Sequence, residues 1–368
     1  MFHRIWAGRR ERPLAPWERL FYWLMVPFGT LYSSFAWARR ELYRAGVLRS
    51  RSVPGLTVVS VGNITVGGTG KSPLTIALAR GLMERDIPVA VVSRGYGAVG
   101  RGSGPLLVSD GTGPLVGPDR AGDEPVMIAR SVPVTVIVSR DRPTGARLAR
   151  DRYGARVVIL DDGFQHRALA RDADVVLLDG RDPFGNRWTL PAGPLREPLS
   201  ALRDADLYFF VYRGLEGIRP VPDRLKGLLA AFNRDALLVQ GSLRIQGLRR
   251  FRGGELRERE WLKGRRVLLV SGIARPADFR AEVEGRGAEV ADHLAYPDHH
   301  DYGSEEAAFI RERLAGVDAE VLLTTAKDEV KLIPAGLRIP EGREGWVAEA
   351  GYDPRSVDLL VDALAGLD

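Results

Sequence analysis

Short apolar runs alternate with helical segments along most of the chain. Runs of buried-strand length lie at 56–61, 88–92, 132–138, 157–160 and 175–178. A Gly-rich loop and a helix from Pro73 to about residue 85 follow the first run. This order predicts an α/β fold with a mostly parallel sheet that helices flank on both faces.

A second, smaller α/β unit is predicted beyond residue 203. Its strands are expected at 207–212, 237–240, 267–271 and 320–324, and its helices near 276–286 and 304–315. Two polar stretches interrupt the pattern. The sequence predicts a loop at 99–120, which could contain a small hairpin at 105–108, and an exposed connection or hairpin at 243–262. We therefore divide the chain into 1–50, 51–203 and 204–368, with the last helix able to pack back on the first unit.

The first 50 residues follow a different pattern. Eleven of the 29 aromatic side chains lie within the first 43 residues, and the stretch between Arg19 and Arg39 has no charged side chain. As a helix, 20–37 would extend about 27 Å, slightly less than the roughly 30 Å of a bilayer's hydrocarbon core. One face of that helix would carry only apolar side chains: Leu20, Trp23, Leu24, Phe28, Leu31 and Phe35.

Three interpretations of this segment remain. It could be a signal peptide cleaved after Ala38, a helix buried in the core, or a membrane anchor. The late, aromatic apolar run is unusual for a signal peptide. Arginines flank both ends and aromatic residues fill the middle, which a membrane interface favours. We therefore favour an anchor that lies in the interface or is partly inserted.

Charge is distributed unevenly along the 368 residues. The chain has 53 Lys and Arg, 47 Asp and Glu, a net charge of +6 and a pI of about 9.7. Residues 1–51 contain ten Arg and three Glu, so the other 317 residues carry 43 basic and 44 acidic side chains. Because the surplus belongs to the aromatic segment, it indicates attraction to anionic lipid rather than nucleic acid. The absence of cysteine excludes disulfides, iron–sulfur clusters and thiolate zinc sites.

A phosphate-binding loop is the strongest motif. The sequence GNITVGGTGKSP at 62–73 stands between a predicted strand and a predicted helix. Glycines let backbone N–H groups face a phosphate, the lysine reaches its outer oxygens, and the hydroxyl can bind Mg²⁺. The expected nucleotide-binding residues are Thr65, Val66, Gly67, Gly68, Thr69, Gly70, Lys71 and Ser72. Thr65 stands where the general pattern has glycine, and a simple Gly-rich turn is the alternative.

Two carboxylates follow the strand predicted at 157–160. A phosphate loop needs an acidic residue at the end of a neighbouring strand to hold its metal ion. Asp161 and Asp162 occupy that place. The alternative is that they only begin a turn.

These motifs, in their order, resemble the tetraacyldisaccharide 4′-kinase family. Besides the phosphate loop, the matching stretches are SRGYG (93–97), GDEP (122–125), LDDGFQHR (160–167), PAGPLREP (191–198), PDHHDY (297–302) and TTAKDEVKL (324–332). The resemblance covers roughly residues 15–335, and the family's loop accepts a small polar residue at the position of Thr65. It implies a kinase that uses ATP and Mg²⁺ to phosphorylate the 4′-hydroxyl of a tetraacylated glucosamine disaccharide 1-phosphate in lipid A biosynthesis.

The resemblance also implies roles for individual residues. Lys71 and the loop would bind the triphosphate, while Ser72, Asp161, Asp162 and Gln165 would hold Mg²⁺. Asp123 would be the catalytic carboxylate, assisted by His299. From the residues alone, Asp123 could equally begin a helix, and nothing but its position beside Asp298 favours His299 over His300.

The acceptor site is expected to be rich in cations, because the substrate carries a 1-phosphate. The candidates in the matching motifs are Tyr96, Arg140, Arg142, His166, Arg196 and Glu197. The implied partners are the acylated lipid and the cytoplasmic face of the inner membrane, without nucleic acid or an obligate protein partner.

A membrane-tethered phosphate-loop NTPase that acts as a switch or assembly ATPase is the alternative function. Such a switch usually carries a Thr-Lys-x-Asp guanine-binding motif. In this chain Lys327 and Asp328 are adjacent, so the spacing fails and GTP is not inferred. The acidic GDEP and histidine-containing PDHH motifs favour the kinase.

Overall fold

The computed structural model describes residues 6–7, 14–95, 104–214 and 217–366. The strands are β1 Thr57–Asn63, β2 Val89–Ser93, β3 Leu106–Asp110, β4 Thr135–Val138, β5 Val157–Asp161, β6 Ala173–Asp179, β7 Leu207–Arg213, β8 Leu237–Arg250, β9 Leu256–Glu258, β10 Arg266–Ser271, β11 Glu289–Ala295, β12 Val321–Thr325 and β13 Glu344–Tyr352. The α-helices are α2 Pro16–Arg44, α3 Lys71–Met83, α4 Pro118–Ala121, α5 Asp123–Ser131, α6 Arg142–Tyr153, α7 Asp223–Phe232, α8 Pro276–Gly285, α9 Ser304–Gly316, α10 Ala326–Leu332 and α11 Pro354–Ala365. Short 3₁₀ helices cover Leu199–Asp204 and Arg259–Leu262.

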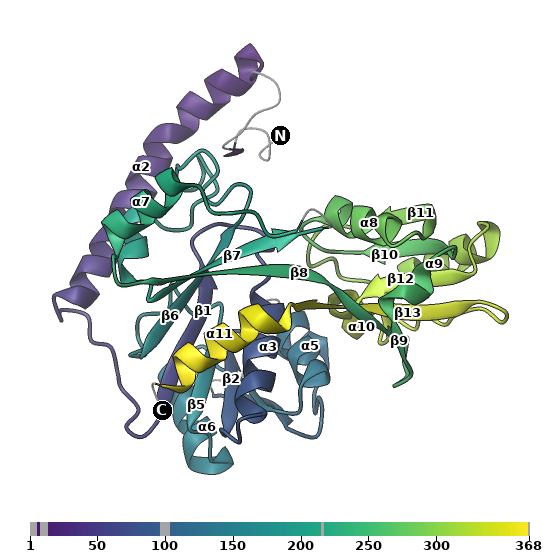
Figure 1. The fold of residues 1–368 in the computed structure, drawn as a ribbon, viewed down its shortest axis with the longest axis horizontal. Coiled ribbons are helices and arrows are strands. Elements are labelled where there is room, and N and C mark those ends of the chain that lie inside the picture. Colours follow the sequence, from purple (N-terminus) through teal and green to yellow (C-terminus); the bar gives the residue numbers. More distant parts are fainter. Residues whose placement is uncertain (1–5, 8–13, 96–103, 215–216, 367–368) are drawn as a thin grey trace.

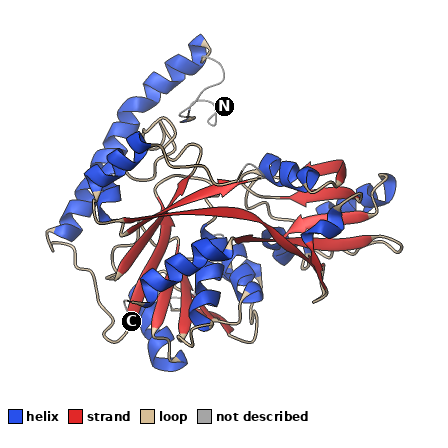
Figure 2. Cartoon of the chain, viewed as in Figure 1, coloured by secondary structure: helices blue, strands red, loops and turns tan. Residues whose placement is uncertain are grey.

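All of these strands belong to one sheet of 13 strands, in the order β11-β10-β12-β13-β8-β7-β6-β1-β5-β2-β4-β3, with β9 beside β8. Most neighbours are parallel, and the antiparallel pairs are β3 with β4, β8 with β9, and β8 with β13. The predicted α/β class is confirmed (Figures 1 and 2).

Strand β8 joins the two halves of the sheet: the first half contains β1 to β7, and the second contains β9 to β13. Its residues 237–243 pair with β7, and residues 243–250 pair with β13. The predicted strand at 237–240 is therefore only the beginning of a 14-residue strand, and the hairpin expected within 243–262 is the turn between β8 and β9. Strand pairing continues from the first half of the sheet through β8 into the second. The domain boundary placed at residue 203 therefore stays a prediction.

Helices cover both faces of the sheet, as buried-strand patterns require. In the first half, α3, α5 and α11 pack on one face, and α6 and α7 cover the other. In the second half, α8 packs on one face and α9 and α10 on the other. The C-terminal helix returns to the first half, where Val361 packs against Gly81 of α3 and Arg85 pairs with Asp362 at 2.6 Å.

The segment 99–120 contains more regular structure than its composition indicates. Its described part forms edge strand β3, which pairs antiparallel with β4, and the short helix α4. The expected hairpin at 105–108 is thus an edge strand of the main sheet. The polar composition of this segment did not indicate strand β3, because an edge strand needs only one apolar face.

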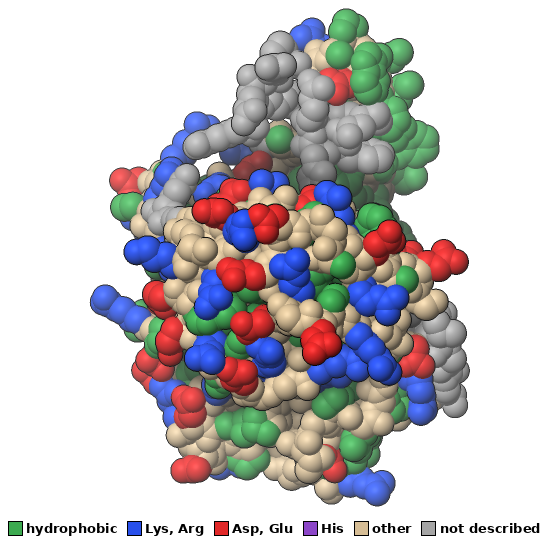
Figure 3. All heavy atoms as spheres, turned by 90° about the vertical axis from the view of Figure 1, so that its right-hand side faces the viewer, with side chains coloured by type: hydrophobic (Ala, Val, Ile, Leu, Met, Phe, Trp, Pro, Cys, Tyr) green, Lys and Arg blue, Asp and Glu red, His purple; other side chains and the backbone are tan. Residues whose placement is uncertain are grey.

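Helix α2 extends past the rest of the body at one end (Figure 1), and its apolar face is exposed. The six residues predicted to share one face are between 57% and 71% exposed, so the interpretation as a buried core helix is wrong. In the space-filling view, hydrophobic side chains gather at the top, whereas acidic and basic side chains intermingle over the second half (Figure 3). Within the described residues, no helix is both long and apolar enough to cross a bilayer.

One buried arginine attaches α2 to the body. Arg40 is 2% exposed, forms ion pairs with Glu197 and Asp204, and donates to the carbonyl oxygen of Ala201 at 2.7 Å. Its guanidinium also lies 5.0 Å from the ring centre of Phe164. These contacts fix the base of a helix whose remaining surface is largely solvent-facing.

Replacing Arg40 by methionine should therefore destabilise the protein by about 3–5 kcal/mol, because Glu197 would keep a buried charge without its partner. The matched control is Arg44→Met. Arg44 pairs with Glu41 and Asp204 at the surface, and its loss should cost about 1 kcal/mol or less. Urea denaturation followed by tryptophan fluorescence measures both; equal losses would contradict the assigned role of Arg40.

Candidate functional site

The phosphate loop lies between β1 and α3, at the carboxyl edge of the sheet. Gly67 and Gly70 have φ of +102° and +89°, a region that glycine adopts without the clash that a Cβ brings. This conformation places Lys71 and Ser72 on the first turn of α3. The backbone donors of a helix start and its dipole then face the loop, which is the arrangement that binds phosphate.

Side chains from both halves of the sheet contact this loop. The hydroxyl of Tyr352, the last residue of β13, donates to the carbonyl oxygen of Gly70 at 2.9 Å. Arg213, the last residue of β7, donates to the carbonyl oxygen of Gly68 at 2.9 Å and to Asp179 at 2.8 Å. Arg275 pairs with the same Asp179 carboxylate at 2.7 Å, so the loop conformation is tied to both halves.

Asp162 is held between two cations beside the loop. Arg196 forms a bidentate pair with it at 3.0–3.1 Å, and the Lys71 ammonium is 3.4 Å away. Lys71 also donates to the side-chain oxygen of Asn63 at 3.1 Å. Burial raises the pKa of Asp162, but the charges of Lys71 and Arg196 outweigh it and lower that pKa to about 2. Asp162 is thus ionised and orients both cations.

Asp161 and Gln165 present buried oxygens that have no hydrogen-bond partner among the described residues. Asp161 is 1% exposed, and its Oδ1 accepts from Thr75 at 3.1 Å while its Oδ2 has no hydrogen bond. Gln165 donates to the carbonyl oxygen of Asn63 at 2.7 Å, which leaves its Oε1 unpaired. Burial, followed by the negative charges of Glu124 and Asp162, raises the pKa of Asp161.

These free oxygens fit a hard cation. Mg²⁺ in phosphate-transfer sites binds one or two carboxylates and takes its other ligands from hydroxyl, water and phosphate. Ser72, on the first turn of α3, supplies a hydroxyl beside the loop. Within the described ranges, no cluster of three or more His, Cys, Asp or Glu side chains occurs.

A second group of charged residues surrounds Asp123. Asp123 is the first residue of α5, where its Oδ1 accepts from the backbone N–H of Glu124 at 2.9 Å. Its Oδ2 faces His299 Nδ1 at 3.0 Å, across the two halves of the molecule. The next residue, His300, stacks on Tyr296 with ring centres 4.6 Å apart. Of the two histidines, His299 is therefore the one in contact with Asp123.

Both members of this pair have shifted pKa values. Burial alone would raise the pKa of Asp123, but the hydrogen bond with His299 and the charges of Lys327 and Lys331 hold it well below its usual range. The hydrogen bond that His299 donates to Asp123 is the main cause that raises the pKa of His299, against burial and Lys327. Asp123 is therefore ionised, and His299 is stabilised when it gains a proton.

Two lysines beside Asp123 are not among the sequence candidates. Lys327 and Lys331 project from α10 and lie 4.0 and 3.3 Å from Asp123 Oδ2. A signal for them exists: the chain has 48 Arg and only five Lys, and two of the five stand four residues apart, which places them on one helical face.

The other predicted residues lie around the phosphate loop or support it. Arg142 is 1% exposed, and its guanidinium donates to the carbonyl oxygens of Ser139 and Asp161 at 2.6 and 3.4 Å. His166 Nε2 lies 3.1 Å from the carbonyl oxygen of exposed Arg140. Burial and neighbouring arginines lower the pKa of His166 to about 4, so the ring is neutral and donates to that carbonyl. Tyr96 lies outside the described residues.

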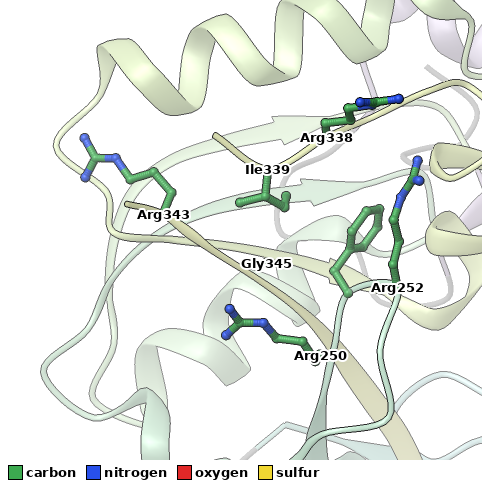
Figure 4. A pocket seen from close by; sticks show the side chains of 7 residues that line it. Arg250, Arg252, Arg338, Ile339, Arg343 and Gly345 are labelled. Atoms are coloured by element: carbon green, nitrogen blue, oxygen red, sulfur yellow. The ribbon is translucent and has the colours of Figure 1, made fainter. Parts of the chain in front are cut away.

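A pocket lined by arginines lies elsewhere. It has a volume of about 380 Å³ and includes Arg250, Arg252, Arg338 and Arg343, at the far end of the second half (Figure 4). None of the predicted site residues lines it. A surface hollow with four cations is thus separate from the phosphate loop, where the convergent polar groups lie.

Taken together, the geometry joins an anion-binding loop, free oxygens for a cation and an ionised carboxylate paired with histidine. Such a site can hold a nucleoside triphosphate and accept a proton from a hydroxyl that attacks its terminal phosphorus.

Comparisons with known proteins agree with this chemistry. The family model described as Tetraacyldisaccharide-1-P 4′-kinase matches residues 21–361. A protein named tetraacyldisaccharide 4′-kinase from Syntrophus aciditrophicus is 42% identical over 85% of each chain. One of the same name from Anaeromyxobacter dehalogenans strain 2CP-C is 43% identical over 89% of this chain and 85% of its own. The crystal structure of LpxK from Aquifex aeolicus in complex with ATP has a TM-score of 0.72 and 31% identity over 92% of this chain and 97% of its own.

Replacing Gly70 by alanine tests how the loop is held. A Cβ there would lie 2.3 Å from the Tyr352 hydroxyl oxygen, and the positive φ adds about 1–2 kcal/mol of strain. Binding of a fluorescent ATP analogue should weaken about tenfold or more. Gly46→Ala is the control, because it has a φ of +74° with no atom within 4 Å; unchanged affinity in Gly70→Ala would refute the role of this conformation.

Proposed function

The chain belongs to the Tetraacyldisaccharide-1-P 4′-kinase family, and on this premise we propose how its residues transfer phosphate. The protein is an ATP-dependent kinase of lipid A biosynthesis that phosphorylates the 4′-hydroxyl of a tetraacylated glucosamine disaccharide 1-phosphate. The observation that supports the proposed residue roles most strongly is the Asp123–His299 contact of 3.0 Å. It supplies the proton acceptor that a kinase needs and simple triphosphate binding does not. Glu124, the residue after Asp123, interacts with the charges of both His299 and Lys71 of the phosphate loop.

Asp123 is the proton acceptor in this proposal. The acceptor hydroxyl loses its proton to Asp123 as its oxygen attacks the γ-phosphorus, and ADP leaves. A carboxylate with a low pKa is a weak base on its own, but proton transfer coupled to phosphorus–oxygen bond formation needs only partial basicity. His299 holds the carboxylate in place through its ring N–H. Its pKa is raised, which favours the presence of an additional proton on the Asp123–His299 pair.

Magnesium would be held by Asp161, Asp162, Gln165 and Ser72. The unpaired oxygens of Asp161 and Gln165 support this assignment. When bound, the ion neutralises phosphate charge. Asp162 has a second task in the proposal, since it already orients Lys71 and Arg196.

An apolar groove beside α2 fits an acyl chain of the substrate. Its lining is Met25, Phe28, Tyr32, Leu190 and Pro191, and its volume is about 500 Å³. The Tyr32 hydroxyl donates to the carbonyl oxygen of Arg196 at 3.0 Å, so the groove begins next to the cation that contacts Asp162. An acyl chain in this groove would place its sugar near the phosphate loop.

The exposed face of α2 is proposed to rest on the cytoplasmic surface of the inner membrane. The six apolar side chains are exposed, and the excess of arginine over acidic residues in 1–51 suits anionic headgroups. Surface attachment would let the acyl chains of the lipid substrate reach the groove without leaving an apolar environment.

The proposed function is tested by transfer of labelled γ-phosphate from ATP to the purified disaccharide lipid. Asp123→Asn should lower kcat by about 10²–10⁴-fold with little change in the KM for ATP, because the role of Asp123 arises in the transition state. Asp223→Asn is the control, since this carboxylate is 98% exposed on α7. Acceptor-independent hydrolysis at the same rate would instead indicate the tethered switch ATPase, and an equal loss of ATP binding would reject Asp123 as the base.

Attachment to the membrane is tested by cosedimentation with vesicles that contain anionic phospholipid. A triple variant with Trp23, Phe28 and Phe35 changed to Gln should bind at least tenfold more weakly, because each side chain contributes about 1–2 kcal/mol when buried. The control is Leu256→Gln with Phe309→Gln, two exposed apolar residues of the second half. If both variants sediment like the parent protein, α2 is not the attachment.

A further inference from the structure

Lys327 occupies a position that the proposed mechanism does not yet use. It is on the first turn of α10, and its side chain is 15% exposed. Its ammonium lies 2.7 Å from Asp298 Oδ1 and 3.2 Å from His299 Nε2. It therefore touches the ring nitrogen of His299 that faces away from Asp123.

The donors and acceptors of this group specify one state of the histidine ring. An ammonium has three N–H donors and no acceptor, so a hydrogen bond with Lys327 requires a lone pair on His299 Nε2. The proton of the neutral ring must then be on Nδ1, where it points at Asp123 Oδ2 at 3.0 Å. In this chain of contacts, Lys327 donates to His299, and His299 donates to Asp123.

Lys327 also opposes protonation of the ring. An imidazolium would turn a second N–H toward the ammonium, and the two positive charges would repel. The other charges that face His299 act in the opposite direction: Asp123 from α5 and Asp298 from its own loop both stabilise the protonated ring. Glu124 of α5 also interacts with the charges of His299 and Lys327. Lys327 thus offsets the effect of these carboxylates on the His299 ring.

The position of α10 is itself fixed with respect to α5. Glu329 of α10 is 1% exposed, pairs with Arg249 of β8 at 2.6 Å and lies 3.6 Å from Arg130 of α5. The helices that carry Lys327 and Asp123 are packed together (Figure 1). The Lys327 ammonium therefore needs no large movement to keep its contact with the ring.

We propose that Lys327 is a positioning residue for the transfer reaction: it keeps the proton of the neutral His299 ring on Nδ1, opposes the uptake of a second proton at Nε2, and thereby keeps Asp123 oriented toward the acceptor hydroxyl. This inference rests on the proposed role of Asp123. It differs from a direct contact between Lys327 and the phosphates of ATP, which would act on nucleotide binding and not on the ring.

The test compares Lys327→Met, Lys327→Gln and Lys327→Arg with the parent protein. In the Met and Gln variants, the acid limb of kcat/KM against pH should move upward by about half a pH unit or more, because a positive charge next to His299 is lost. The KM for ATP should stay within about twofold, and Lys327→Arg, which keeps the charge, should restore the limb. Lys226→Met, an exposed lysine of α7, is the matched control.

A measurement without turnover separates this inference from the proposed function. The ring ¹⁵N shifts of His299 should titrate at higher pH in Lys327→Met than in the parent, whether or not the protein transfers phosphate. In the His299→Ala background, Lys327→Met should cost little further activity. Three results would each overturn the proposal. The first is an unchanged ¹⁵N titration of His299 in the folded variants, and the second is that Lys327→Met lowers activity equally in the parent and in the His299→Ala background. The third is a raised KM for ATP together with an unchanged pH profile of kcat/KM.

Discussion

The hydrogen bond between Asp123 and His299 is the contact on which the proposed active site depends. Asp123 begins α5 of the first half, and His299 lies in the loop before α9 of the second half. Neither half contains the pair alone. The continuous sheet through β8, the Tyr352 contact with Gly70 and the Glu329 pairs with Arg249 and Arg130 all fix the distance between these halves.

The burial of charged groups explains why oppositely charged side chains surround this contact. The site contains several carboxylates with little exposure, and an unpaired buried charge costs several kcal/mol. Asp162 is balanced by Lys71 and Arg196, and Asp123 by His299 with two lysines. The unpaired oxygens of Asp161 and Gln165 are the exception. They mark the place where a ligand, rather than another side chain, completes the balance.

The sequence predicted those parts of the fold and site that depend on local pattern. Apolar runs located β1 and β5, and glycine spacing located the loop, because both properties repeat over a few residues. Family resemblance selected Asp123 and His299, which lie 176 positions apart. Strand β13 and the joining role of β8 were not foreseen, since they depend on pairing over long separations. Lys327 was missed for the same reason: its partners belong to another loop and helix.

The proposed role of Asp123 as the proton acceptor is best checked by a crystal structure with a non-hydrolysable ATP analogue and the disaccharide lipid bound together. This role predicts the 4′-hydroxyl within hydrogen-bond reach of Asp123 Oδ2 and in line with the γ-phosphorus, with Asp123 still bonded to His299. A 4′-hydroxyl bound to a different side chain, with Asp123 remote from the γ-phosphate, would contradict it.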